Sequence, residues 1–264
     1  MRANPAPFLE KVSYTELPPP AGLSAVIHCL WRFEAPGPGP LDRIVPDGRC
    51  ELIVHAGTPF SERRDDGRWR RQPRVLFAGQ VTRPLHVRAN GPADVIGVRF
   101  RFASPRAFIG HALREATDRR IDLAGEWKDR AFSFESAIAF VQERVARTSH
   151  PRDAVVERCA DRIERSAGTV EVASLVELSG LGRRQLERRF ADAVGVGPAL
   201  LASIVRFRRV FDEIDHGGTR PWTDAAIAAG YSDQSHFIRE FRRFVGCTPR
   251  EFLKTSQGLS MALV

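Results

Sequence analysis

Long hydrophobic runs are missing from this sequence of 264 residues. No stretch approaches the roughly 18 consecutive apolar residues that a membrane-spanning helix needs. Prolines and charged residues also interrupt the first 30 residues, where a signal peptide would need an apolar core. We therefore expect a cytoplasmic protein that does not engage a membrane.

Paired cysteines are missing as well. The four cysteines show no C-x-x-C spacing and stand far apart, at Cys29, Cys50, Cys159 and Cys247. Each lies inside an apolar pattern, where a thiol behaves as a small hydrophobic group. The sequence thus predicts no disulfide, no zinc site and no cofactor.

Clustered histidines, which a cupin-type metal enzyme would need, are also lacking. His28, His55 and His86 fall on separate predicted strands rather than in a His-x-His motif. We interpret them as core or rim histidines and expect no metal, no catalytic residues and no enzymatic activity. A cupin-type metal enzyme, or a DNA-repair protein fused to a DNA-binding domain, remains the alternative. The repair protein would need a reactive cysteine and a separate zinc-binding cysteine cluster.

Lysine is scarce, because only 3 of the 40 basic residues are Lys, whereas acidic residues number 32 and leave a net charge of +8. A basic excess favours nucleic acid as a partner. The excess is unevenly placed, however: residues 1–150 carry +6 and residues 151–264 only +2. Any argument for DNA binding must therefore rest on where the arginines lie.

The first hundred residues show the two-residue period of β-strands. Ile27, Cys29, Trp31 and Phe33 alternate with polar positions, and the stretch 94–100 behaves in the same way. Short apolar runs at 50–55, 75–78 and 85–89 lie between turn-forming Pro, Gly, Asn and Asp residues. We expect an antiparallel β sandwich, with the polar stretch 61–74 as an exposed hairpin tip or mobile loop.

After residue 102 the period becomes helical. Phe134, Ile138, Val141 and Val145 form one apolar stripe, and this helix is expected to end near Pro151. We place a domain boundary there, between an N-terminal domain of residues 1–150 and a C-terminal, all-helical domain of residues 151–264. The expected fold class is α+β.

The C-terminal part contains an internal repeat. Five positions of one segment recur 51 residues later: Leu186, Arg188, Phe190, Gly195 and Pro198 correspond to Phe237, Arg239, Phe241, Gly246 and Pro249. Each copy predicts a short apolar helix, a turn containing glycine, and a second helix with polar residues on its outer face. This is the helix-turn-helix pattern, whose second helix enters the DNA major groove.

The predicted recognition helices span about 183–194 and 233–245. Arginine pairs with guanine and glutamine with adenine, and arginines behind the leading turns suit phosphate. The candidate DNA-binding residues are Arg183, Arg184, Gln185, Arg188, Arg189, Gln234, Ser235, His236, Arg239, Arg242 and Arg243. A single helix pair with surface arginines is often only a solvated hairpin, but two copies separated by a helical segment at 200–214 are hard to explain in that way.

Residues 222–252 (WTDAAIAAGYSDQSHFIREFRRFVGCTPREF) closely resemble the second helix-turn-helix of the AraC/XylS family of bacterial transcription regulators. Residues 180–190 (GLGRRQLERRF) are similar to the first motif, and Arg206-Phe-Arg-Arg209 to the end of the linker helix. The resemblance implies a seven-helix domain that binds double-stranded DNA, with base contacts from Arg184, Arg188, Gln234, Ser235 and Arg239. Gly182 departs from the Ser or Thr that usually caps the first recognition helix.

The N-terminal half resembles sensory domains that accompany this DNA-binding domain, at Leu17-Pro-Pro-Pro20, Val45-Pro-Asp-Gly48 and Gly97-Val-Arg-Phe100. The resemblance implies a cupin-like or jelly-roll fold that binds a small-molecule effector, dimerises, or both. The ligand-binding residues and the effector are not given by the sequence, and contact with RNA polymerase and a homodimer stay open. The aromatic content favours an apolar or aromatic effector.

Overall fold

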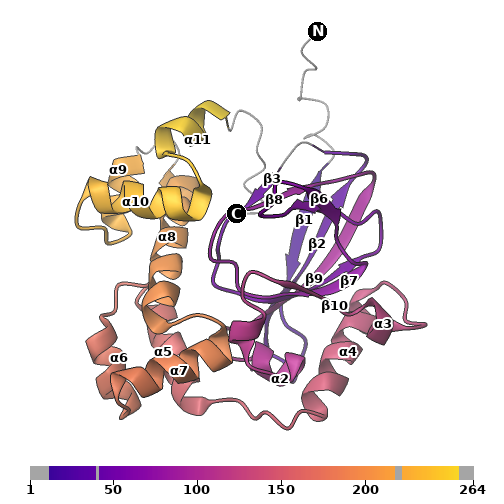
Figure 1. Ribbon diagram of the computed structural model, residues 1–264, viewed down its shortest axis with the longest axis horizontal. Helices are drawn as coiled ribbons and strands as arrows, with labels where there is room; N and C mark the ends of the chain where they lie inside the picture. Colours follow the sequence, from indigo (N-terminus) through magenta and orange to yellow (C-terminus); the bar gives the residue numbers. More distant parts are fainter. Residues whose placement is uncertain (1–11, 40–41, 218–221, 256–264) are drawn as a thin grey trace.

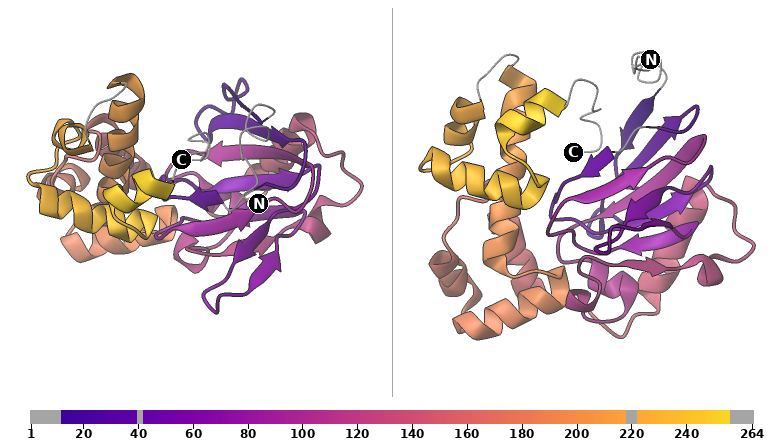
Figure 2. Two further views of the ribbon diagram at one scale, coloured as in Figure 1. Left: turned by 90° about the horizontal axis from the view of Figure 1, so that it is seen from above. Right: turned by 45° about the horizontal axis from the view of Figure 1, so that its top comes forward.

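A computed structural model describes residues 12–39, 42–217 and 222–255. Two antiparallel β-sheets form the first half of the described chain, and helices form the second (Figure 1). This is the α+β architecture that the change of period near residue 102 predicts. The two sheets lie face to face (Figure 2), as expected for a sandwich.

The larger sheet has six strands in the order β1-β2-β9-β4-β7-β10. In that order the strands are Ser13–Leu17, Ile27–Ala35, Ala93–Phe100, Glu51–His55, Val75–Ala78 and Arg120–Asp122. Trp31 of β2 pairs with Gly97 of β9, and a Cβ atom on Gly97 would lie only 1.9 Å from the Trp31 ring. Glycine is therefore needed at position 97 so that the Trp31 indole can lie across the sheet.

The smaller sheet has the order β3-β8-β5-β6, with strands Asp42–Ile44, Leu85–Arg88, Ser61–Arg63 and Trp69–Arg71. The stretch 61–74 forms the β5–β6 hairpin, but its ends are not exposed as we expected. Glu62 is 2% exposed, because it pairs with Arg120 at 3.3 Å and accepts a hydrogen bond from Gln72. The sequence alone does not distinguish a carboxylate that is buried with such partners from one that lies on a surface loop.

Short helices close one end of the sandwich: α2 (Pro105–Ile109), the 3-10 turn η1 (Leu113–Glu115), α3 (Ala124–Trp127) and α4 (Phe134–Ala146). The predicted stripe at 134–145 is confirmed as α4. Its Phe140 and Val141 pack with Phe77, Phe100 and Phe108 in the main core of the N-terminal half.

Seven helices follow within the described residues, as the resemblance implies. They are α5 (Ala154–Arg165), α6 (Val172–Ser179), α7 (Arg183–Val194), α8 (Pro198–Gly217), α9 (Trp222–Ala228), α10 (Gln234–Val245) and α11 (Pro249–Thr255). They form two cores that share α8: Leu201 packs with Phe190 in one, and Phe207 packs with Phe241 in the other. Figure 1 shows α8 running between the α6–α7 pair and the α9–α10 pair.

The N-terminal sandwich rests against these helices. Val45 belongs to the core around Phe207, and Phe102 to the core around Phe190. Gly48, at φ +81°, lies so close to α8 that a Cβ atom there would be 3.0 Å from Leu201 Cδ1. The Val45–Gly48 loop is therefore the point at which the sandwich meets the helix between the two motifs.

Candidate nucleic-acid interface

The first helix-turn-helix consists of α6 and α7. Gly180 ends α6 in the left-handed conformation, at φ +66°, and Leu175, Leu186 and Phe190 are buried between the helices. Four of the candidate DNA-binding residues are exposed along the leading turns of α7: Arg183, Arg184, Gln185 and Arg188. The N-cap residue of α7 is Gly182, which supplies no side-chain hydrogen bond. The apolar face thus holds α7 in place and leaves its first turns free for a ligand.

The second helix-turn-helix consists of α9 and α10. Ala225, Ala226 and Ala229 are buried, and their small side chains let α9 approach α10 closely. Asp233 caps α10 by accepting a hydrogen bond from the His236 backbone N–H at 2.8 Å. The exposed candidates on this helix are Gln234, Ser235, Arg239, Arg242 and Arg243, while His236 is half-buried.

Arg189 is a candidate DNA-binding residue whose side chain pairs with another residue of the protein. Its guanidinium makes two hydrogen bonds to the Asp153 carboxylate, at 2.7 and 2.6 Å. Asp153 is also the N-cap of α5, where it accepts from the Val155 and Val156 backbone N–H groups. The side chain of Arg189 therefore joins α7 to α5 in this structure.

Glu240, on the inner face of α10, is a residue that we did not single out from the sequence. It is 9% exposed and accepts a hydrogen bond from the Tyr231 hydroxyl at 2.7 Å. Ser203 and Arg206 of α8 also contact its carboxylate, the latter at 3.4 Å. Glu240 thus ties the second recognition helix to α8. Its position in an arginine-rich helix gave no signal that it would be buried.

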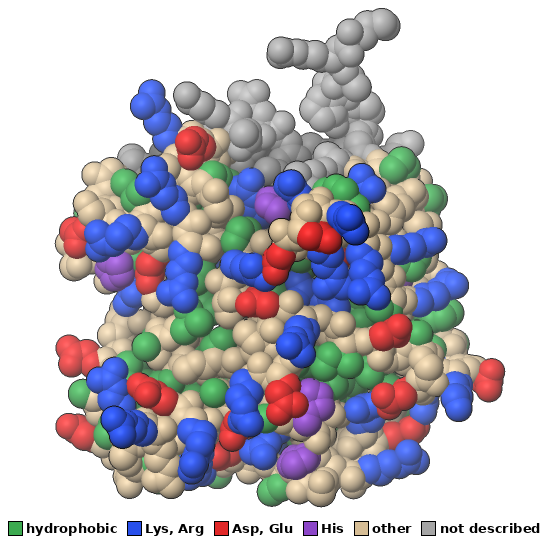
Figure 3. Space-filling model, in the orientation of Figure 1, with side chains coloured by type: hydrophobic (Ala, Val, Ile, Leu, Met, Phe, Trp, Pro, Cys, Tyr) green, Lys and Arg blue, Asp and Glu red, His purple; other side chains and the backbone are tan. Residues whose placement is uncertain are grey.

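The two motifs lie at opposite ends of a long spacer. With 20 residues, α8 is about 30 Å long, close to the roughly 34 Å between successive major grooves on one face of B-DNA. Figure 3 shows basic side chains gathered in two groups over the helical half, with acidic side chains among them. On this face the helical half therefore has no continuous basic surface.

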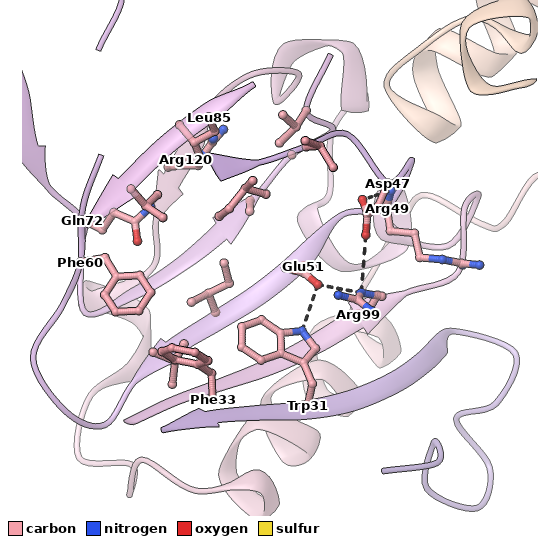
Figure 4. A pocket seen from close by; sticks show the side chains of 18 of the residues that line it. Trp31, Phe33, Asp47, Arg49, Glu51, Phe60, Gln72, Leu85, Arg99 and Arg120 are labelled. Carbon is pink, nitrogen blue, oxygen red and sulfur yellow. Dashed lines mark hydrogen bonds and ion pairs between the residues drawn. The ribbon is translucent and has the colours of Figure 1, made fainter. Parts of the chain in front are cut away.

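A pocket opens between the two sheets of the N-terminal half (Figure 4). The space around it is about 950 Å³, which includes open solvent, but the centre of a water-sized sphere can reach only about 90 Å³ of it. Phe33 and Phe60 line one part of it, Glu51 and Arg99 lie at another, and Trp31 lies between them. Glu51 accepts hydrogen bonds from Trp31 Nε1 at 2.9 Å and from Arg99 Nε at 2.8 Å.

The histidines of the sandwich form no cluster. His55 shares a hydrogen bond with Gln72 at 3.1 Å, and burial lowers the pKa of its ring to about 4, so the ring is neutral at pH 7. His28 and His86 lie on β2 and β8. Within residues 12–39, 42–217 and 222–255, no group of three or more His, Cys, Asp or Glu residues is placed to hold a metal ion.

In the part of the chain that the structure describes, no single helix is long and apolar enough to cross a membrane. Only α7 and α8 taken together satisfy the length and composition criteria, and they are bent by 58° with respect to each other.

Two family models match the chain. One, described as a helix-turn-helix domain, matches residues 175–255, and the other, a domain of unknown function named DUF6597, matches residues 15–122. No curated protein sequence matches significantly.

Among solved structures, the chain is similar to fatty-acid-bound ToxT from Vibrio cholerae, with 11% identity, a TM-score of 0.49, and coverage of 98% of this chain and 99% of that one. It is also similar to the C-terminal domain of AraT, a response regulator from Geobacillus stearothermophilus, with 19% identity, a TM-score of 0.36, and coverage of 41% and 90%.

The paired motifs and the matched helix-turn-helix model define a DNA-binding transcription regulator. More particularly, residues 175–255 form an AraC-type helix-turn-helix domain, and residues 15–122 match the DUF6597 domain.

Proposed function

We propose that this regulator reads DNA with two recognition helices, α7 and α10, placed in successive major grooves on one face of the duplex. The observation that carries this proposal is the position of α8, whose length of about 30 Å separates two helices with exposed Arg and Gln on their leading turns. A lone motif would offer a single groove contact and less sequence information.

The proposed roles follow from side-chain position. On α7, Arg184 and Arg188 read bases, with Arg183 and Gln185 beside them. On α10, Gln234, Ser235 and Arg239 read bases, with His236 at the edge of the contact. Arg242 and Arg243 suit phosphate, because they lie farther along α10. Arg189 is a weaker candidate for phosphate, since leaving Asp153 would break a bidentate ion pair.

We further propose that the pocket between the sheets receives a small effector with apolar or aromatic character. Its Trp31, Phe33 and Phe60 side chains support this, as does the contact of the Val45–Gly48 loop with α8. We also propose RNA polymerase and a second copy of the chain as partners and the bacterial cytoplasm as the place of action, which the match of residues 175–255 to a helix-turn-helix domain supports. We assign it no catalytic activity.

Selection of bound sequences from random duplex DNA with the full chain tests the DNA-binding proposal. We expect Arg188→Ala and Arg239→Ala each to cost about 1–3 kcal/mol of binding and to relax one base position. Arg70→Ala, which removes an exposed arginine from β6, is the matched control and should leave affinity and sequence preference unchanged. If both recognition-helix variants bind the selected site as tightly as the parent, the assignment of the helices is wrong.

A further inference from the structure

Four arginines line the pocket between the sheets: Arg49, Arg99, Arg120 and Arg208. Three of them have a carboxylate partner. Arg49 pairs with Glu164, Arg99 with Glu51, and Arg120 with Glu62. Each of these positive charges is therefore already matched by the protein itself.

Arg208 differs from the other three. Its Nη1 atom is buried and has no hydrogen-bond partner among the residues that the structure describes. Burial lowers the pKa of the guanidinium, and the charges of Asp47 and Asp212 oppose this effect. A buried donor on a charged group is costly to leave unmatched. Arg208 lines the pocket, so a ligand that enters beside it can supply the acceptor that this guanidinium lacks.

The acidic side chains of the pocket do not supply this acceptor. Asp47 accepts from the Arg49 backbone N–H at 2.9 Å and lies 3.6 Å from Arg99 Nε. Glu51 is held by Trp31 and Arg99, as Figure 4 shows. Both carboxylates are thus engaged on the Arg99 side of the pocket.

The apolar residues that line the pocket indicate what kind of ligand body fits there. Trp31, Phe33 and Phe60 provide flat apolar surfaces, and Val87 and Val95 add aliphatic ones. A fully charged or sugar-like molecule would leave these surfaces poorly used. An apolar body with one anionic group would satisfy both the aromatic wall and Arg208.

We propose that the pocket binds an organic acid whose apolar body packs on Trp31, Phe33 and Phe60 and whose anionic group accepts hydrogen bonds from Arg208. The proposal rests on the effector role proposed above and adds the chemistry of the ligand. Because Arg208 belongs to α8, the bound acid would join the sandwich to the helix between the two motifs. The ligand would thereby bias the placement of α8 and, through it, DNA binding.

Matched acids and amides test the proposal on the full chain. The probes are benzoate, 4-phenylbutyrate and indole-3-acetate, each compared with its neutral primary amide by titration calorimetry and thermal shift at pH 7. We expect at least one acid to bind about tenfold or more tightly than its amide, the difference that one charge-assisted hydrogen bond provides.

Variants of α8 assign the preference to one side chain. Arg208→Gln should remove the acid–amide difference, and Arg208→Lys should keep part of it because the charge remains. Arg209→Gln is the matched control: Arg209 is the next residue on the helix, half-exposed and paired with Glu213 at 3.0 Å. It should keep the full preference.

The outcomes separate the ligand chemistry from the proposed function. If amides bind as well as acids, or if Arg208→Gln keeps the preference, the anion assignment is wrong, although the pocket still holds an effector. If none of the acids binds more tightly than its amide, the proposal likewise fails. DNA binding by the unliganded chain is measured separately and is unaffected by either result.

Discussion

The two recognition helices have the same length and the same kind of ending, yet they are held in different ways. Both contain 12 residues and end at a glycine in the left-handed conformation, Gly195 for α7 and Gly246 for α10. The end of α7 is attached to the N-terminal half: Thr117 donates a hydrogen bond to the Gly195 carbonyl at 2.6 Å, and Arg114 pairs with Asp192. Figure 1 shows α7 beside α2, with α10 toward the other end of α8.

The second helix is held by α8 and by the neighbouring parts of its own motif. Glu240 receives hydrogen bonds from Tyr231 and from Ser203 of α8, and Arg206 of α8 completes its surroundings. The residue that contacts the sandwich lies just after α10: Cys247 accepts a hydrogen bond at its Sγ from Arg43, at 3.0 Å. A change in the sandwich would thus act on α7 directly and on α10 largely through α8.

Of the variants that compare the two helices, the one that removes the Glu240 carboxylate should lose the most stability. Glu240→Ala leaves the partly buried Arg206 and the buried Tyr231 hydroxyl without their acceptor, so we expect a loss of about 3 kcal/mol in the free energy of unfolding. Glu187→Ala, which removes the half-exposed partner of Arg183 on α7, is the control and should change stability by less than about 0.5 kcal/mol. Urea unfolding of both variants measures the difference; equal losses would contradict the distinction between the helices.

Weakening the attachment of α7 should have an intermediate effect. Thr117→Val keeps the side-chain shape but removes the donor to the Gly195 carbonyl, and should cost about 1 kcal/mol. The same variant should alter protection of α7 amides in hydrogen exchange more than that of α10 amides. Equal changes in both helices would show that α7 is not held separately.

The N-cap of α10 should make a smaller contribution to stability, and this contribution should depend on pH. The pKa of Asp233 lies below its ordinary value because the carboxylate accepts the His236 backbone N–H. Its stabilising contribution is therefore complete above the ordinary pKa of about 4 and is lost as the pH falls through the lowered value. Asp233→Ala should lower the Tm at pH 7, and the gap from the parent should narrow in acid. A gap that stays constant would show that the charge of Asp233 plays no part.

The smallest expected effect concerns the missing cap of α7. Gly182→Ser introduces a side-chain acceptor at the N-cap, where Gly182 already has extended backbone angles. We expect a gain of a few tenths of a kcal/mol. A loss of stability in thermal unfolding would mean that the serine side chain does not fit this turn.

The elements with clear periods could be predicted from the sequence. Local apolar patterns gave α4 and the strands β7 and β9, and the internal repeat gave both recognition helices to within a residue. Glu62, Glu240 and Arg208 could not be placed in the same way. Each is a charged residue whose burial depends on partners far away in the chain, so local patterns carry no signal for it. The attachment of Arg189 to Asp153, 36 residues earlier, is a further example.

Sequence selection with the full chain, followed by selection with the Arg188→Ala and Arg239→Ala variants, distinguishes two groove contacts from one. We expect a site with two elements about 10–10.5 base pairs apart, with Arg188→Ala relaxing one element and Arg239→Ala the other. A selected site with a single element, or variants that relax the same base position, would contradict it.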